Sequence, residues 1–395
     1  MESTTNPFRY LDNAATSWPK PPAVLAAMNS FYQDLGVAAE RSGSARAGAV
    51  DRAIQKCRHQ VTELLSGDRE ASVVFGCNGT DVLNMALHGV LREGDHVVAT
   101  VVEHNSVLRP LEYLRQHRGI TYTLAEADSN GVVCPRSIER LLQSSTRLVC
   151  LSHVSNVTGA VQPVREVGRI CREHELLYLL DAAQSVGHFP VDVGSIGCDL
   201  LASSGHKGLL GPLGTGFLYI GKRAAPCIRP LRQGGTGTRS ETINQPEELP
   251  YRLETGNLNS AGVMGLSAGI EYVSKLGWDE VESHEHELSN HLIGGLAEIG
   301  HVRLIGHQSP HRSGIVSFQV EGMDPSQLAG VLDASFGIQV RAGLHCAPKI
   351  HESLGTLAGG GAVRVSPGMF NTMSDVQNMV SAIEQITSSV RHDGS

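Results

Sequence analysis

Three consecutive segments decide the fold class of this chain: RLVCLSHV at residues 147–154, VREVGRICREHE at 164–175 and LLYLLDAA at 176–183. The first and third are short apolar runs that are typical of buried strands, and the second has a helical pattern. A strand, a helix and a second strand at this spacing predict a βαβ unit with parallel strands.

The same alternation runs from about residue 70 to residue 220 and predicts seven strands in a largely parallel sheet flanked by helices. The other five expected strands are ASVVFG (71–76), HVVATVVE (96–103), ITYTLAEA (120–127), DLLASSGH (199–206) and TGFLYIGK (215–222). After residue 265 the pattern changes to a long helix and two strands, GIVSFQVEG (314–322) and GIQVRAG (337–343), with helices between them. We therefore expect a large domain at 21–265 and a smaller α+β domain at 266–395 that also takes in residues 1–20.

The composition excludes several classes of function. The chain has 395 residues and a formal net charge of −8, without any run of lysine or arginine, so nucleic acid is not expected as a partner. No signal peptide is recognisable, and no apolar run reaches the roughly 20 residues that span a bilayer, so we expect a cytoplasmic protein without a membrane segment.

The eight cysteines include no C-x-x-C pair, which favours reduced thiols and gives no sign of a metal site. The metal-like stretch SHEHELSNH (283–291) is interpreted as a solvated helix, because His286 and His291 are five residues apart instead of four.

A lysine and an aspartate follow two of the expected strands. Lys207 lies in SSGHKGLLGP (203–212), where small neighbours allow its amine to be desolvated and to form a Schiff base. Asp181 ends the strand of LLYLLDAAQS. Alone, each residue has an ordinary explanation, a loop lysine and a turn aspartate. Together they suit pyridoxal phosphate (PLP), which needs a lysine for its aldehyde and a carboxylate for its pyridine nitrogen.

The phosphate of such a cofactor needs hydrogen-bond donors. GCNGTDVLNMAL (76–87) passes from a strand into a helix, so Gly79 and Thr80 would meet an anion at a helix N-terminus. Ordinary N-capping by Thr80 is an equally good interpretation of this motif. Ser204 and His206 add donors beside Lys207.

The motifs taken together resemble one family nearly end to end. The chain is similar to the class V aminotransferase-like PLP enzymes of fold type I, and specifically to the cysteine desulfurases and selenocysteine lyases. The motifs that carry the resemblance are YLDNAATSWPKP, VVEHNSVLRP, HVSNVTG, DAAQS, SSGHK, RAGLHCAP and VRVSPGMFNT.

The resemblance implies a role for each matching residue. Lys207 would hold PLP as a Schiff base, Asp181 would pair with the ring nitrogen, and His104 would stack on the ring. Asn156 and Gln184 would bind the phenolic side of the ring. The phosphate would lie against Gly79, Thr80, Ser204 and His206. Arg364, together with Asn156 and Arg341, would bind the substrate, with the guanidinium of Arg364 on its α-carboxylate.

The resemblance also implies that Cys346 is the sulfur carrier. As a thiolate it would attack the sulfur of L-cysteine and become a persulfide while L-alanine leaves, with His345 or His104 helping to deprotonate it. Among the other thiols Cys77 is the best rival, but its apolar setting favours core packing. Members with so compact a cysteine loop often need a separate sulfur-acceptor protein.

Two positions depart from the family, Asn257 and Ser44, the latter where a histidine often follows Ser-Gly, and two other functions stay open. Asn257 stands in ETGNLNS where members usually have the threonine that reaches the partner subunit's phosphate, so a homodimer with Asn257 at the partner's cofactor is a hypothesis. The first alternative is a related PLP-dependent lyase or aminotransferase that acts on another amino acid, for example selenocysteine. The second is a protein of this fold without PLP, which the presence of Lys207, Asp181 and His104 disfavours.

Overall fold

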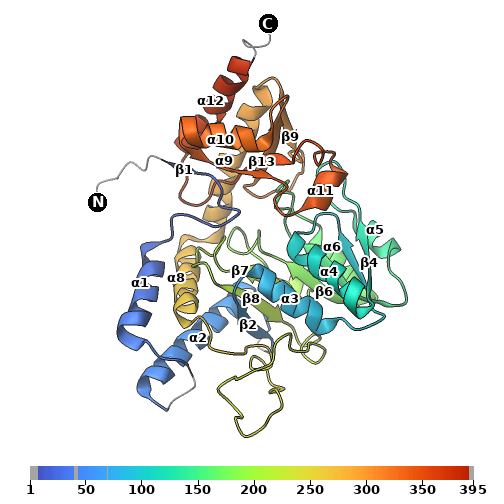
Figure 1. Ribbon diagram of the computed structural model, residues 1–395, viewed down its shortest axis with the longest axis vertical. Coiled ribbons are helices and arrows are strands. Elements are labelled where there is room, and N and C mark those ends of the chain that lie inside the picture. Colours follow the sequence, from blue (N-terminus) through green and yellow to red (C-terminus); the bar gives the residue numbers. More distant parts are fainter. Residues whose placement is uncertain (1–7, 40–42, 69, 391–395) are drawn as a thin grey trace.

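The computed structural model describes residues 8–39, 43–68 and 70–390, and a seven-stranded sheet forms its centre (Figure 1). The strands follow the spatial order β2, β8, β7, β6, β5, β3, β4. β8 is antiparallel to both of its neighbours and the remaining pairs are parallel, which confirms the expected mainly parallel sheet. The strands are β2 (Ser72–Gly76), β3 (His96–Thr100), β4 (Thr121–Ala125), β5 (Thr146–Ser152), β6 (Leu177–Asp181), β7 (Leu200–Ser204) and β8 (Gly216–Ile220).

Both faces of this sheet are buried along its inner strands, which explains why these strands are mostly apolar, whereas the edge strand β4 is partly exposed. Alternate residues of a strand point to opposite faces. In β5, Val149 and Leu151 belong to one hydrophobic cluster, whereas Leu148 and Cys150 belong to another. Helices cover both faces of such a sheet, as in other parallel α/β folds.

The helices of this part mostly follow the strands in the chain. They are α1 (Pro22–Ser30), which continues into a π-helical turn at Phe31–Leu35, α2 (Ala45–Leu64), α3 (Gly79–Val90), α4 (Asn105–Arg118), α5 (Pro135–Arg140), α6 (Val164–Glu173), α7 (Val193–Ile196) and α8 (Ser260–Leu276). In the described ranges, no helix combines the length and the apolar character needed to cross a membrane.

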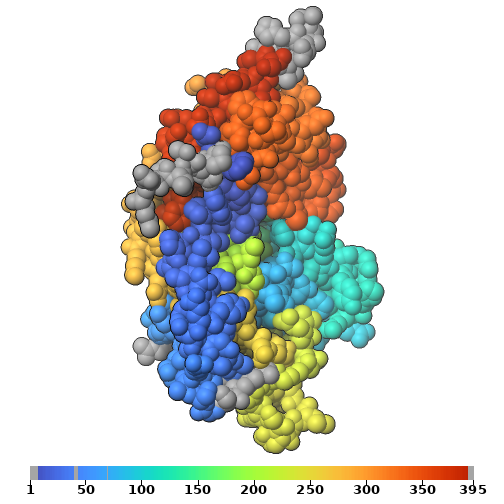
Figure 2. All heavy atoms as spheres, turned by 60° about the vertical axis from the view of Figure 1, so that its left-hand side comes forward, coloured from blue at the N-terminus to red at the C-terminus, as the bar shows by residue number. Residues whose placement is uncertain are grey.

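A second, antiparallel sheet lies at the other end of the molecule, in the part coloured orange to red in Figures 1 and 2. Its strands follow the order β12 (Arg341–Gly343), β13 (Ala362–Val365), β10 (Val316–Val320) and β9 (Val302–Ile305). The sequence predicts β10 and the region of β12, but not β9 or β13. The helices here are α9 (Trp278–Glu298), α10 (Pro325–Phe336), α11 (Pro348–Ser353) and α12 (Met373–Val390).

Two features concern the expected division of the chain into a large and a small domain. The division itself stays a prediction. The N-terminal strand β1 (Arg9–Tyr10) pairs with β11 (Ile338–Gln339), so the first described residues lie against the C-terminal part. Helix α8 runs without a break across residue 265 and packs against α1 and α2.

The stretch SHEHELSNH is helical, but the expectation that it is solvated is wrong for one of its faces. It lies in α9, where Glu285 and Leu288 are buried together with further leucines. The buried carboxylate of Glu285 contacts Nδ1 of His188 at 2.9 Å, which explains a charged residue on the inner face of the helix.

Candidate active site

A cavity of about 280 Å³ opens at the carboxyl ends of the parallel strands, where ligands gather in this kind of sheet. All of the candidate residues except Asn257, His345 and Cys346 line it. They are Gly79, Thr80, His104, Asn156, Asp181, Gln184, Ser204, His206, Lys207, Arg341 and Arg364. The edge of the sheet therefore brings together residues that are far apart in the sequence.

Lys207 follows β7 by three residues and is partly buried in this cavity. Burial lowers the pKa of its amine to about 8, against the opposing effect of the nearby carboxylate of Asp181. About a tenth of the amine is therefore neutral at pH 7, far more than for an ordinary lysine, and the neutral amine is the form that attacks an aldehyde.

Asp181 is the last residue of β6 and is 7% exposed. One of its oxygens accepts a hydrogen bond from the backbone N–H of Ala183, at 3.0 Å. Burial raises the pKa of the carboxyl group, although the hydrogen bond from Ala183 and the charge of Lys207 act in the opposite direction. A protonated ring nitrogen would offset this cost of burial by supplying a positive partner.

His104 follows β3 and caps α4 with its side chain. Its Nδ1 accepts a hydrogen bond from the backbone N–H of Ser106, at 3.0 Å, so the proton of the neutral ring lies on Nε2. Burial and the charge of Lys207 lower the pKa of the imidazole to about 4. The ring is therefore neutral at neutral pH, as a group that stacks on a cofactor or accepts a proton must be.

The two interpretations of Thr80 can be separated. The N-cap of α3 is Asn78, whose side-chain oxygen accepts from the backbone N–H of Asp81 at 2.9 Å, so the capping interpretation of Thr80 is wrong. The hydroxyl of Thr80 instead lies 2.7 Å from that of Ser106. Ser106 lines the cavity and received no role in the sequence analysis, although it is only two residues from His104.

The cradle around the start of α3 fits a phosphate group. A Cβ atom on Gly79 would lie 2.6 Å from Oγ of Ser204, so glycine is needed for the close approach of these two segments. Nδ1 of His206 and Oε1 of Gln184 are buried and have no protein partner. Since buried polar atoms are normally paired, these two atoms indicate a polar ligand of the kind that PLP is.

Arg364 lies in β13 and is 1% exposed, yet its guanidinium is not fully used. Nη2 donates to the carboxylate of Asp12 at 2.7 Å, and Nη1 donates to the backbone oxygen of Asn156 at 3.1 Å. Nε has no partner. Asp12 stands in the motif YLDNAAT and also received no role in the sequence analysis, because only the fold brings it to Arg364.

Cys346 does not line the cavity, but it is tied to residues that do. Its sulfur lies 3.5 Å from Nη2 of Arg341, and its backbone oxygen accepts from the N–H of Asn105 at 2.6 Å. The preceding backbone oxygen, of His345, accepts from the side chain of Asn156 at 2.7 Å. Cys346 therefore lies beside the cavity, between α4 and the loop that carries Asn156.

Two expectations about this region are wrong. The ring of His345 is buried and faces His351 and the backbone oxygen of Arg341, so it is not placed to deprotonate the thiol. Cys77 is exposed, not packed in the core, because it lies in the turn between β2 and α3. All eight cysteines lie in the described ranges, and three of them, Cys77, Cys134 and Cys346, are exposed.

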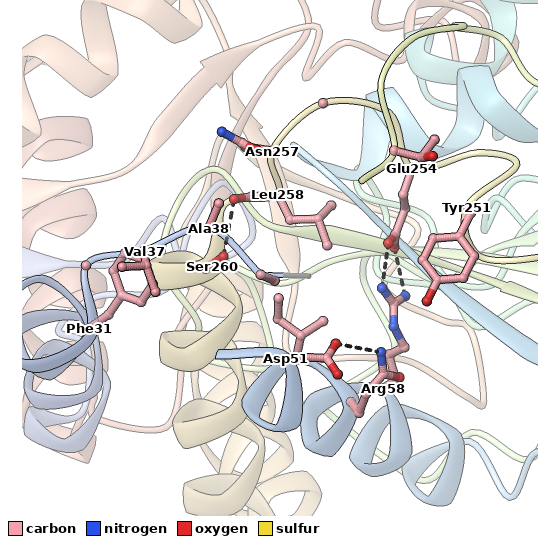
Figure 3. Close-up of a pocket in the computed structure, with 16 residues that line it drawn as sticks. Phe31, Val37, Ala38, Asp51, Arg58, Tyr251, Glu254, Asn257, Leu258 and Ser260 are labelled. Atoms are coloured by element: carbon pink, nitrogen blue, oxygen red, sulfur yellow. Dashed lines mark hydrogen bonds and ion pairs between the residues drawn. The ribbon is translucent and has the colours of Figure 1, made fainter. Parts of the chain in front are cut away.

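Asn257 lies on a separate pocket of about 250 Å³ that Figure 3 shows. Leu258 and Ser260 line the same pocket, and the ion pair between Arg58 and Glu254 forms part of its wall. Within one chain, Asn257 is therefore not brought to the cavity of Lys207.

Comparison with known proteins identifies the family. Residues 9–379 match the family model described as aminotransferase class-V, so the chain belongs to the class V aminotransferases.

Similar proteins in this family are named as cysteine desulfurases. A probable cysteine desulfurase from Methanothermobacter thermautotrophicus is 37% identical over 381 residues, which are 95% of this chain and 94% of that protein. The apo structure of a cysteine desulfurase from Thermococcus onnurineus NA1 matches with a TM-score of 0.88 at 32% identity, over 97% of this chain and 95% of that one. The Escherichia coli cysteine desulfurase CsdA, in an S-sulfonic acid form, gives 0.87 at 29% identity over the same shares. The expected family and fold are confirmed.

Proposed function

We propose that this chain is a PLP-dependent cysteine desulfurase, which converts L-cysteine to L-alanine and leaves the sulfur on Cys346 as a persulfide. The observation that carries the proposal is the meeting of Lys207, Asp181 and His104 in one cavity, with Cys346 beside it. The names of the similar proteins support it. When bound, PLP supplies an electron sink that weakens the bond between Cβ and sulfur.

The residues of the chain divide the remaining work. Lys207 would hold the cofactor, and its neutral amine would take the α-proton of the substrate. Asp181 would keep the pyridine nitrogen protonated, and His104 would lie against the ring. Thr80, Ser204 and His206 would hold the phosphate, while Asn156 and Gln184 would bind the phenolic side. Arg364 would bind the substrate carboxylate through its guanidinium, which lines the cavity.

Sulfur transfer then takes place at the edge of the cavity. The thiolate of Cys346 attacks the substrate sulfur, so that an S–S bond forms while the bond between Cβ and sulfur breaks. The electron pair of the broken bond between Cβ and sulfur passes to the organic fragment, which takes up protons and leaves as L-alanine. The guanidinium of Arg341, 3.5 Å from the sulfur, faces the negative charge of the attacking thiolate.

The proposal is tested by following L-alanine, sulfide and protein persulfide after addition of L-cysteine. We expect Lys207→Ala to lose multiple turnover, and Cys346→Ala to lose the persulfide and most L-alanine formation. Cys134→Ala is the matched control, because Cys134 is also exposed but lies at the start of α5. Native turnover in Cys346→Ala would refute the carrier role, and retained turnover in Lys207→Ala would refute the Schiff-base role.

The proposal includes a homodimer in which Asn257 faces the partner's cofactor phosphate. The pocket at Asn257 also contains Thr236 and Tyr251, which flank a loop that projects from the molecule (Figures 1 and 2). Ile243 in this loop is fully exposed in the single chain and is available for contact with a second copy. Asn257→Ala should then weaken PLP binding only in the dimer, which equilibrium dialysis at two protein concentrations can measure.

Transfer of the persulfide to a separate acceptor protein belongs to the same proposal. The side chain of Cys346 is exposed in the single chain, so a second thiol can reach the bound sulfur.

A further inference from the structure

Two adjacent residues at the proposed sulfur carrier have an unusual backbone conformation. The φ angle is +51° at His345 and +57° at Cys346, and neither residue is a glycine. A side chain with a Cβ disfavours this left-handed region, and two such residues in succession are rarer still. The surroundings must therefore impose the conformation.

Part of the restraint comes from backbone oxygens. The oxygen of His345 accepts from the side chain of Asn156 at 2.7 Å, and that of Cys346 accepts from the backbone N–H of Asn105 at 2.6 Å. These two bonds hold the peptide groups, but they leave the position of the His345 ring undetermined.

A row of buried side chains fixes that ring. Thr356 and His351 are fully buried and His345 is 2% exposed. The hydroxyl of Thr356 lies 2.7 Å from Nδ1 of His351, Nε2 of His351 lies 3.4 Å from Nδ1 of His345, and Nε2 of His345 lies 3.4 Å from the backbone oxygen of Arg341. The two rings lie within 29° of parallel.

One arrangement of protons satisfies every contact of this row. The oxygen of Arg341 can only accept, so Nε2 of His345 carries a proton and its Nδ1 must accept from Nε2–H of His351. Nδ1 of His351 is then left to accept from the hydroxyl of Thr356, which prefers this contact to its 3.3 Å contact with the backbone oxygen of His351. Both rings are neutral in this arrangement.

The row ends at the residue whose side chain meets the thiol. Its last acceptor is the backbone oxygen of Arg341, and Nη2 of the same residue lies 3.5 Å from the sulfur of Cys346. The row therefore holds both His345, which precedes the cysteine, and Arg341, which supplies the guanidinium. Neither His351 nor Thr356 lines the cavity.

We infer that His351 and Thr356 are positioning residues for sulfur transfer: through His345 they hold the sulfur of Cys346 against the guanidinium of Arg341. This inference rests on the proposed function in one respect, namely that Cys346 is the residue that takes the sulfur. It goes beyond that function, because it assigns a role to two residues that touch neither substrate nor cofactor.

The test compares Thr356→Val, which removes the hydroxyl at nearly constant volume, with Thr356→Ser, which keeps it. The purified holoenzyme is alkylated with iodoacetamide without L-cysteine, and the rate at each thiol is followed by peptide mass spectrometry. We expect the rate at Cys346 to fall about two- to tenfold in Thr356→Val, the range of one net hydrogen bond, and to stay native in Thr356→Ser. The kcat for L-cysteine should fall in the same proportion at an unchanged KM.

Cys77 provides an internal control, since it is an exposed thiol in the same molecule. An unchanged or faster rate at Cys346 in Thr356→Val would overturn the inference, and so would an equal change at Cys77, which would indicate general loosening. If Thr356→Val does not fold, His351→Leu removes both contacts of the second ring and must give the same fall. Native turnover in Cys346→Ala would refute the proposed function, whereas the alkylation rates decide the positioning role independently.

Discussion

The substitution Arg364→Lys tests the proposed carboxylate site most directly. Arg364 is 1% exposed, and two of its three nitrogens already bind Asp12 and the backbone oxygen of Asn156. The third, Nε, has no protein partner, and the side chain lines the cavity proposed for the substrate. Lysine keeps the positive charge but offers a single nitrogen, which cannot hold Asp12 and a substrate carboxylate in the same directions.

The size of the effect follows from the bond that is lost. A hydrogen bond between charged groups contributes about 1.5–3 kcal/mol, which corresponds to a loss of about 10- to 150-fold in kcat/KM for L-cysteine. The loss in kcat/KM should result mainly from a higher KM, because the carboxylate is bound both before and during the reaction.

The assay needs a ligand that lacks the carboxylate. Cysteamine has the amine and the thiol of L-cysteine without its carboxyl group, so its inhibition constant should be nearly the same in the native enzyme and in Arg364→Lys. Arg169→Lys is the matched control, since Arg169 is exposed and pairs only with Glu173. The reasoning is refuted if Arg364→Lys leaves kcat/KM for L-cysteine within about twofold of native, or weakens cysteamine as much as L-cysteine.

Three further predictions concern groups whose ionisation or pairing the structure defines. Because burial lowers the pKa of Lys207 to about 8, the rate at which the apoenzyme captures PLP should rise with pH through about 8, and a rate that is constant across this range in stopped-flow absorbance would contradict it. Glu254→Gln removes the negative charge that faces the largely buried guanidinium of Arg58 and should lower the free energy of unfolding in urea by about 3–5 kcal/mol; a loss below about 1 kcal/mol would show that solvent reaches the pair. Burial lowers the pKa of His188, but the charge and the hydrogen bond of Glu285 outweigh this effect and raise the pKa above its usual value. The stability that this pair contributes is therefore complete below about pH 6.5 and is lost as the pH rises through the raised pKa. Glu285→Gln should remove that decline, and an unchanged decline would assign it to other groups.

The central sheet could be predicted because both of its faces are buried, so its strands are short apolar runs that the sequence displays. The strand β13 could not, although it is equally buried. Its sequence, AVRV, contains Arg364, and the charge interrupts the apolar pattern on which the prediction depends. The register pairs Arg364 with Ser317 of β10, so the fold places a cation in the small sheet, where its partner comes from the N-terminal segment.

The candidate cavity could be predicted to the extent that its residues follow parallel strands. Asp181, Ser204 and Lys207 lie at or just after strand ends, and the geometry of a parallel sheet collects such residues at one edge. Asp12 lay outside this reasoning, because it meets Arg364 across 352 positions of sequence through a contact between the N-terminal segment and the second sheet. No local pattern contains that information.

The thiols show most clearly where sequence reasoning stops. An apolar neighbourhood in the sequence favoured a buried Cys77, yet the turn before α3 leaves it exposed, just as Cys134 and Cys346 are exposed. Exposure therefore does not single out the proposed sulfur carrier. Among these three thiols, the left-handed backbone and the guanidinium at 3.5 Å belong to Cys346. Buried contacts of His345 lie behind both features, so in the role that we infer for His351 and Thr356, side chains that solvent does not reach position an exposed thiol.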